Sequence, residues 1–120
     1  MSIKSFWQLR VWQAGMDLVE EIYLLTHEFP RHEIYGLTSQ IRRAAVSVPS
    51  NLAEGHSREH LKEYLHHVSI AQGSLAELET PLEIATRLKY VRREHLLPIL
   101  ERIFSLGRQL YALRDSLRRA

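Results

Sequence analysis

The chain has 120 residues, of which 45% are hydrophobic and 25% are charged. These values are typical of one globular domain with its own core, so we expect a single domain over residues 1–120. Sixteen lysines and arginines against fourteen acidic residues give a net charge of +2, well below the excess that by itself indicates a nucleic-acid-binding protein. Because there is no cysteine, disulfides and thiolate catalysis are excluded.

No apolar run approaches the ~20 residues that a membrane-spanning helix needs. The first seven residues also lack the apolar stretch of a signal peptide. We therefore expect a cytoplasmic protein that does not associate with a membrane.

The first predicted helix covers residues from about Gln8 to Glu28. Apolar and small residues recur along it at steps of three and four, as one buried face of a helix requires. They are Val11, Gly15, Leu18, Ile22, Leu25 and Phe29. The pair Phe29–Pro30 ends the helix, because the residue before a proline disfavours helical geometry.

The second predicted helix begins near Gly36 and ends at Gly55, a residue suited to a left-handed C-terminal position. Its core face carries Ile41, Ala44, Ala45, Val48 and Leu52. Pro49 lies inside this pattern, where it removes a backbone hydrogen bond at a cost of ~3 kcal/mol. Two short helices and one kinked helix both accommodate such a proline. The apolar spacing continues through Pro49 without a shift, which favours the kinked helix.

The third predicted helix is long, from about Ser57 or Arg58 to Lys89, and contains Pro81. Its apolar residues keep their spacing on both sides of Pro81, so we expect a second kink. They are Leu61, Tyr64, Val68, Ala71, Leu75, Leu78, Leu82 and Ala85. The helix therefore offers one continuous apolar face to the core.

The fourth predicted helix runs from about Glu94 or His95 to Arg118. Pro98 costs little only in the first turn, which places the start near His95. The core face carries Leu96, Leu100, Ile103, Leu110 and Leu117. Four amphipathic helices with short links predict an all-α fold, an antiparallel up-down-up-down four-helix bundle with proline-kinked long helices.

The run from Tyr35 to Gly55, YGLTSQIRRAAVSVPSNLAEG, resembles the signature of four-helix-bundle proteins from intervening sequences of bacterial large-subunit ribosomal RNA genes. Further matches are Val11–Ala14, Phe29–Pro30 and Gly73–Thr80, so the resemblance covers nearly the whole chain. This family includes accessory proteins of diversity-generating retroelements, which are pentameric and basic and act with a reverse transcriptase and its RNA. The resemblance implies a bacterial four-helix bundle, a homopentamer, and RNA or DNA and a reverse transcriptase as partners. Most members have no assigned activity.

Two sets of apolar residues lie outside the predicted core faces. They are Val46, Pro49 and Ala53 of the second predicted helix and Ile70, Ile84 and Leu88 of the third. A monomer would expose both sets to water, which soluble monomers seldom tolerate. We therefore expect a homo-oligomer in which unlike faces of neighbouring subunits meet and close into a ring. The number of five subunits comes from the resemblance alone.

Basic residues gather at two places, which are the nucleic-acid-binding sites that the sequence offers. One set surrounds the turn after the third predicted helix, and the other ends the fourth. They are Arg87, Lys89, Arg92 and Arg93, and Arg114, Arg118 and Arg119. In an antiparallel bundle the two sets form separate patches at opposite ends of the fourth helix. Cations at helix C-termini also stabilise the helix dipole, which explains the same residues equally well.

Arg42 and Arg43 are the only charged residues that precede Glu54 in the second predicted helix. A guanidinium group on a covered helix needs an acidic or carbonyl partner. Glu54, Glu77 and Glu79 are the acidic residues available. We expect structural ion pairs within or between subunits, in preference to direct ligand binding.

Histidines His56, His60 and His67, with Glu63, follow a spacing that could place them on one helix face. Glu63 and His66 also match the Glu-x-x-His spacing of di-iron bundles, which need a second such motif and two more glutamates. The sequence has no second motif, so solvated histidines are the favoured interpretation, and we expect no metal or cofactor. It also lacks a Gly-x-Ser-x-Gly element and a phosphate-binding glycine loop, so no enzymatic activity is expected.

The leading functional hypothesis is a non-enzymatic, homo-oligomeric scaffold that binds nucleic acid or a nucleic-acid enzyme such as a reverse transcriptase. The alternative is a purely structural or protein-interaction module without nucleic-acid binding. A metal-dependent enzyme ranks third.

Overall fold

The computed structural model describes residues 5–6 and 9–120, and within them all regular secondary structure is helical. The elements are α1 (Arg10–Thr26), the short 3-10 helix η2 (Arg31–Glu33), α2 (Leu37–His56), α3 (Leu61–Glu77), α4 (Glu79–Arg87) and α5 (Arg93–Arg118). The predicted all-α class and the helical bundle are therefore confirmed. The predicted start of the first helix at Gln8 lies outside the described residues. No described helix is long and apolar enough to cross a membrane.

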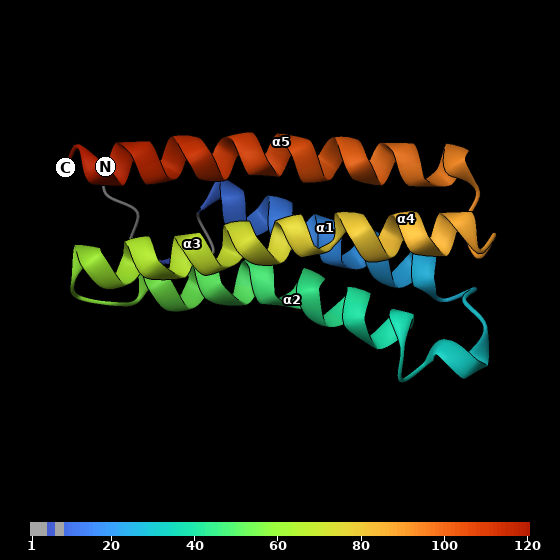
Figure 1. Ribbon diagram of the computed structural model, residues 1–120. Helices are drawn as coiled ribbons and strands as arrows, with labels where there is room; N and C mark the ends of the chain where they lie inside the picture. The colour runs from blue at the N-terminus through green and yellow to red at the C-terminus, as the bar shows by residue number, and fades with distance from the viewer. Residues whose placement is uncertain (1–4, 7–8) are drawn as a thin grey trace.

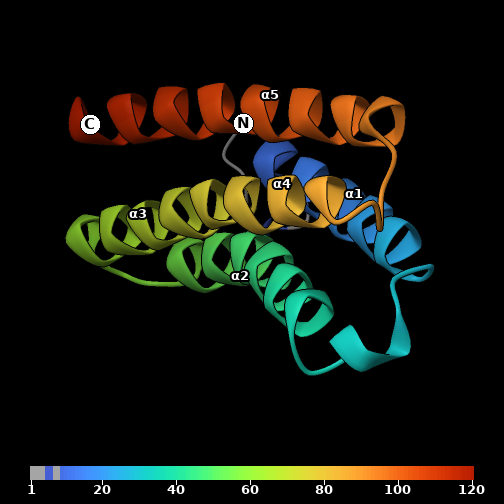
Figure 2. The same ribbon diagram turned by 45° about the vertical axis from the view of Figure 1, so that its right-hand side comes forward.

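The long helices lie side by side in an elongated body of 46 × 24 × 20 Å. Figures 1 and 2 show α3 and α4 end to end at the front, α5 above them, α2 below them and α1 behind. The chain turns back on itself at η2, at residues 57–60 and at residues 88–92. In this arrangement the α1–α2 side of the bundle lies opposite the α3–α5 side.

The core forms where the predicted apolar faces meet inside the bundle. Its fully buried large side chains are Leu18 and Ile22 of α1, Ile41, Val48 and Leu52 of α2, Val68, Leu78 and Leu82 of the third predicted helix, and Leu96, Ile103, Leu106 and Leu110 of α5. Full burial of one such side chain contributes about 1.5–3 kcal/mol of hydrophobic free energy. Each long helix is therefore held in position by its packing against the other helices.

The third predicted helix is two helices in the structure, α3 and α4, with Leu78 between them. Leu78 keeps helical dihedral angles, φ −68° and ψ −31°, so α4 continues the course of α3. Pro81 has no N–H group to donate to the carbonyl of Glu77, and this missing bond explains why the helical ladder is interrupted here. The interruption does not shift the apolar face, because Leu78 and Leu82 are both fully buried.

A residue in left-handed conformation ends α4, whereas the sequence predicted such a residue at the end of α2. Lys89 has a φ of 68°, and no described glycine has a positive φ. The N–H of Tyr90 donates to the carbonyl of Ala85 and that of Lys89 to Thr86, a Schellman motif with lysine in the usual glycine position. The helix therefore ends before Lys89, and the left-handed role predicted for Gly55 is wrong.

Pro49 of α2 and Pro98 of α5 lie beyond the first turn of their helices. The helix α2 is continuous from Leu37 to His56, which favours one helix over the two-helix alternative at Pro49. Pro49 is buried against α1, where a Cβ on Gly15 would lie 3.4 Å from the Cβ of Pro49. Pro98 is the sixth residue of α5, not a first-turn residue, because α5 starts earlier than His95. Because Pro98 has no N–H group, the carbonyl of Glu94 has no helical donor. Glu94 is exposed, so water can supply the missing hydrogen bond.

Gly55 allows α2 and α3 to pack closely. A Cβ at this position would lie 2.7 Å from the Cβ of His67 and 3.2 Å from Cδ1 of Tyr64, whereas a Cβ at Gly73 would have no neighbour within 4 Å. We predict that Gly55→Ala lowers the free energy of unfolding by about 1–3 kcal/mol, because the two helices must separate. Gly73→Ala, the matched control, should raise it by up to ~1 kcal/mol. Urea denaturation measures both changes, and a neutral Gly55→Ala would contradict the close packing.

Candidate nucleic-acid interface

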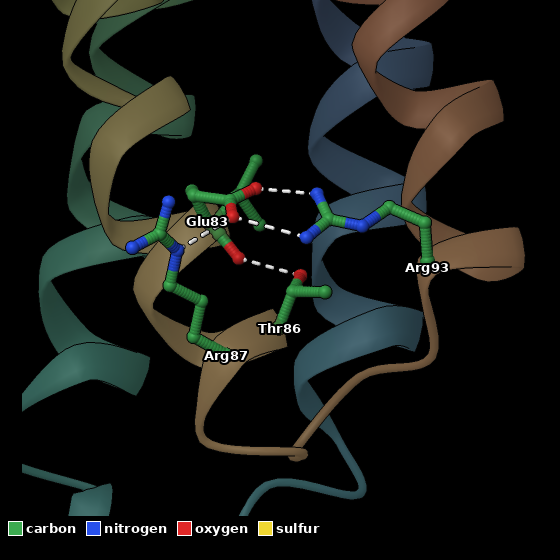
Figure 3. Close-up of polar contacts among 5 residues, drawn as sticks. Glu83, Thr86, Arg87 and Arg93 are labelled. Atoms are coloured by element: carbon green, nitrogen blue, oxygen red, sulfur yellow. Dashed lines mark hydrogen bonds and ion pairs between the residues drawn. The ribbon is translucent and has the colours of Figure 1, made fainter.

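The α4–α5 turn brings one carboxylate and two guanidinium groups together (Figure 3). Glu83 of α4 accepts hydrogen bonds from Arg93 Nη2 of α5 and from Arg87 Nε, both at 3.0 Å. A second bond joins Arg93 Nη1 to the other oxygen of Glu83. These bonds, first from Arg93 and then from Arg87, lower the pKa of Glu83 to about 2. Two of the predicted nucleic-acid-binding arginines are therefore held by an internal carboxylate.

Lys89 and Arg92 complete the predicted basic set at this turn. Arg92 Nη1 lies 3.7 Å from Glu94 Oε1, and both side chains are largely exposed. Lys89 is exposed, and it forms no ion pair within the described part of the chain. Two carboxylates, Glu83 and Glu94, pair with three of these four cations, and Glu28 lines a pocket shared with Lys89 and Arg92. Positive charge is therefore in local excess at this turn, with Lys89 unpaired and Arg92 only loosely paired.

The second predicted basic set lies at the other end of α5. Arg114 Nη1 donates to Oε1 of Gln72 on α3 at 3.3 Å, and Arg119 Nη2 lies 3.1 Å from Asp115 Oδ2. Arg118 is exposed. A helix of 26 residues is roughly 39 Å long, so the two basic sets are well separated patches on one subunit.

Arg42 binds partners that the sequence did not indicate. Its Nε donates to Thr26 Oγ1 at 2.8 Å, and its guanidinium carbon lies 4.4 Å from the centre of the Tyr23 ring. The acidic residue Glu54, predicted as a partner, instead pairs with Arg58 one turn later, at 2.6 Å. Within the described residues, the ion pair expected at Arg42 is thus replaced by a hydroxyl group and an aromatic face.

Arg43 and Glu77 line a polar groove between α2 and α3, which we call the α2–α3 groove. Its volume is about 370 Å³. Its lining residues are Tyr35, Gly36, Ser39, Gln40, Arg43, Ala44, Ser47, Ser74 and Glu77. Arg43 and Glu77 do not pair with each other, so the structural ion pairs predicted for them are not formed among the described residues. Glu79, the third acidic partner predicted, is exposed.

A chain of side-chain hydrogen bonds crosses from α2 to α3 beside this groove. The hydroxyl groups of Ser47 and Ser74 share a bond of 2.8 Å. Asn51 Nδ2 donates to Ser47 Oγ at 3.0 Å, which leaves Asn51 Oδ1 to accept from His67 Nδ1 at 3.0 Å. These hydrogen bonds link the side chains of α2 to those of α3.

The segment before α2 is attached to the α4–α5 turn. Tyr90 donates its hydroxyl proton to Glu33 Oε2 at 3.0 Å, and the N–H of Leu37 donates to Glu33 Oε1 at 3.2 Å. The bonds from Leu37 and then Tyr90 lower the pKa of Glu33. A Cβ at Gly36 would lie 2.6 Å from Glu33 Oε1, so a larger residue there would displace this carboxylate. This contact places Tyr35, an exposed residue, at the same end of the bundle as Lys89.

The four residues considered as metal ligands do not converge. His67 bonds Asn51, and the His56 ring meets the Tyr64 ring edge-on at 5.8 Å. His60 precedes α3 as its N-cap residue. Within the residues that the structure describes, no three ligand-type side chains are grouped closely enough to hold a metal ion.

The predicted interface residues separate into exposed and buried ones. Val46, Ile70, Ile84 and Leu88 are exposed large apolar side chains, and Ala53 is half-buried. Pro49 must be removed from this set, because it faces α1 inside the chain. The remaining residues lie on α2 and on α3–α4, as the prediction required.

A further apolar row on α5 was missed. Leu97, Phe104 and Tyr111 are 51%, 48% and 69% exposed, and they follow one another at steps of seven residues. Phe104 and Ile84 line one groove of about 430 Å³ between α4 and α5. The seven-residue spacing is visible in the sequence, although these residues lie outside the predicted core face of this helix.

Comparison with known proteins identifies the family. The model of the 23S rRNA-intervening sequence protein family matches residues 7–112. The chain belongs to this family. The match spans α1 to α4 and most of α5, in agreement with the resemblance seen along Tyr35–Gly55.

One solved structure resembles the whole bundle. It is the crystal structure of a protein of unknown function from the S23 ribosomal protein family of Bacteroides thetaiotaomicron. The TM-score is 0.77, over 87% of this chain and 97% of that one. The two sequences are 20% identical, so this likeness shows the fold alone. No curated protein matches the sequence.

The pairing of Glu83 predicts a pH dependence of stability. Its folded-state pKa of about 2 lies below the ordinary value of 4.5, so the pair contributes stability above about pH 4.5 and loses this contribution as the pH falls toward 2. Glu83→Gln should therefore be less stable than the wild type at pH 7, and the difference should disappear in acid. Urea unfolding at several pH values measures this difference. The control is Glu59→Gln, at an exposed residue without a described ion pair. A stability difference between Glu83→Gln and the wild type that stays the same at every pH would contradict the lowered pKa of Glu83.

Proposed function

We propose that this protein is a non-enzymatic, homo-oligomeric scaffold that binds RNA and holds a nucleic-acid enzyme, such as a reverse transcriptase, beside it. The observation that carries the proposal is the surplus of positive charge on Lys89 and Arg92 at the α4–α5 turn. The family to which the chain belongs is named after intervening sequences of 23S rRNA, which supports RNA as the ligand. Action within a diversity-generating retroelement is the form of this function that the sequence resemblance implies.

Fixed geometry makes this turn a suitable contact for a phosphate backbone. Glu83 holds Arg87 and Arg93 on opposite sides of its carboxylate, so the turn between α4 and α5 is bridged by ionic hydrogen bonds. Lys89 projects from this bridged turn without an ion pair to any described residue, and Arg92 has only the long contact of 3.7 Å to the exposed Glu94. Phosphate contacts of this kind are independent of sequence and weaken strongly with salt.

Assembly would multiply this modest charge. We take the subunit to be an up-down-up-down bundle with kinks at its prolines, and the oligomer to be a pentameric ring. Exposed apolar residues on different helices support a head-to-tail contact: Val46 on α2, and Ile84 of α4 with Phe104 of α5, which line one groove. Five subunits with a net charge of +2 each would repeat the basic turn around the ring.

A protein-interaction module without RNA binding is the second candidate function. The observation that favours it is the exposed row of Leu97, Phe104 and Tyr111. Aromatic residues in an apolar groove are typical of the central part of protein interfaces. If this row contacts a foreign protein and not a neighbouring subunit, assembly and RNA binding are both unnecessary.

The ring predicts that a charge in the α4–α5 groove blocks assembly. Ile84→Glu should convert the oligomer to a monomer of 14.1 kDa while helix content is kept, because Ile84 is outside the core. Leu61→Glu is the matched control, since Leu61 is 41% exposed and Ile84 42%, but Leu61 lies at the far end of the α3–α4 pair. Light scattering after gel filtration gives the masses. A wild-type monomer at micromolar concentration would contradict the ring.

The basic turn predicts salt-dependent RNA binding. The wild type should bind a fluorescein-labelled RNA at low salt, with log K falling linearly against log salt. The double variant Lys89→Glu, Arg92→Glu should bind roughly tenfold or more weakly and show a shallower slope, because phosphate contacts are lost. Arg93 is left unchanged because its loss would disturb Glu83. The control is Lys62→Glu at the exposed start of α3. No binding by the wild type, measured by fluorescence anisotropy, would favour the interaction module.

A further inference from the structure

The α2–α3 groove is built from two sequence runs that the basic turn does not involve. Tyr35, Ser39 and Arg43 come from the beginning of α2 and the residues before it, and Ser74 and Glu77 come from the last turns of α3. Its volume of about 370 Å³ is within the range of small-ligand sites in proteins. Two stretches far apart in the sequence thus place hydroxyl, guanidinium, carboxylate and phenol groups around one small space.

The two charged groups of this groove, both exposed, have no partner among the described residues. Neither Arg43 nor Glu77 has a hydrogen bond or ion pair with any residue that the structure describes, and they form none with each other although they line the same groove. Elsewhere, Arg102 binds Glu21 at 2.7 Å and Arg58 binds Glu54 at 2.6 Å. The groove therefore holds a cation and an anion apart, with space for a ligand that offers both acceptor and donor groups.

The floor of the groove is rigid. Ser47 and Ser74 share their hydrogen bond of 2.8 Å at the base, and Asn51 holds Ser47 through its side-chain amide at 3.0 Å. Ser74 is 9% exposed, so its hydroxyl group is fixed in a largely covered position. A ligand in the groove would thus meet a preformed polar surface, which lowers the entropic cost of binding.

An aromatic ring stands beside this polar surface. The Tyr35 side chain is 95% exposed, and its hydroxyl group has no partner among the described residues. A fully exposed tyrosine gains nothing for the fold, but its ring is a suitable surface for stacking an unpaired base. The hydrogen bonds of Glu33 to Leu37 and Tyr90 fix the segments on both sides of Tyr35.

We propose that the α2–α3 groove binds one unstacked nucleotide of a single-stranded RNA. The base stacks on Tyr35, the phosphate pairs with Arg43, and the ribose 2′-hydroxyl donates to Glu77. Guanidinium groups bind phosphate oxygens, and a carboxylate that accepts from the 2′-hydroxyl favours RNA over DNA. Tyr35 lies at the end of the bundle that carries Lys89 and Arg92, because Glu33 is bonded to Tyr90, so we expect one strand to contact both sites. The proposal rests on the RNA-binding function above and assigns it a specific site.

The experiment measures the affinity of the full chain for a short fluorescein-labelled oligouridine by fluorescence anisotropy. Tyr35→Leu should raise the Kd about tenfold, because base–aromatic stacking is lost, while Tyr35→Phe retains the ring and should leave it nearly unchanged. Arg43→Gln should weaken binding several-fold more than Arg10→Gln, which removes an exposed arginine at the start of α1. Glu77→Ala should reduce the preference of the wild type for oligouridine over the matching DNA. Circular dichroism verifies that each variant is folded.

Four outcomes would overturn the proposal in distinguishable ways. If the wild type binds oligouridine but Tyr35→Leu and Arg43→Gln bind as tightly as Arg10→Gln, the groove is not the site, and the proposed function stands without it. If the wild type binds no RNA, both the function and the groove assignment fail. If free uridine monophosphate binds as tightly as the oligonucleotide, the groove is a site for a free nucleotide and not for a strand. An equal effect of Tyr35→Leu on duplex RNA would also exclude an unstacked base.

Discussion

The close approach of α2 and α3 is the constraint on which the other features of this bundle depend. Small residues permit this approach, above all Gly55, which has no room for a Cβ against His67. The hydrogen bond between Ser47 and Ser74 then fixes the two helices at the opposite side of the contact. Because the helices meet through small side chains, their longer polar residues project outward together and form the α2–α3 groove. A larger residue at the contact would separate the groups that we assign to RNA.

Ion pairing distinguishes structural charges from those available for a ligand. Glu83 satisfies Arg87 and Arg93, and the lowered pKa of Glu83 reflects that stabilisation. Arg42 is likewise satisfied, by Thr26 and the Tyr23 ring. Lys89 and Arg92 at the α4–α5 turn and Arg43 in the α2–α3 groove are not satisfied in this way. A net charge of +2 understates what the protein can present locally to a polyanion.

The sequence predicted the helices and their buried faces because burial at every third or fourth residue is a local, periodic requirement. It did not predict how charged residues pair: the Thr26 partner of Arg42 lies on another helix, and its position depends on how α1 and α2 cross. The left-handed residue was assigned wrongly, because Gly55 is needed for packing and Lys89 takes that position although a lysine gives no signal for it. The groove was missed for a similar reason. Arg43 and Glu77 become neighbours only after α2 and α3 have folded back on each other.

The most direct test of this account is to map RNA contacts by photocrosslinking. Wild-type protein would be irradiated with oligouridine that contains 4-thiouridine, and the crosslinked peptides would be identified by mass spectrometry. The account predicts crosslinks within residues 35–43, at or beside Tyr35, together with crosslinks around the α4–α5 turn. Crosslinks confined to the C-terminal end of α5, or none in the segment that contains Tyr35, would contradict it.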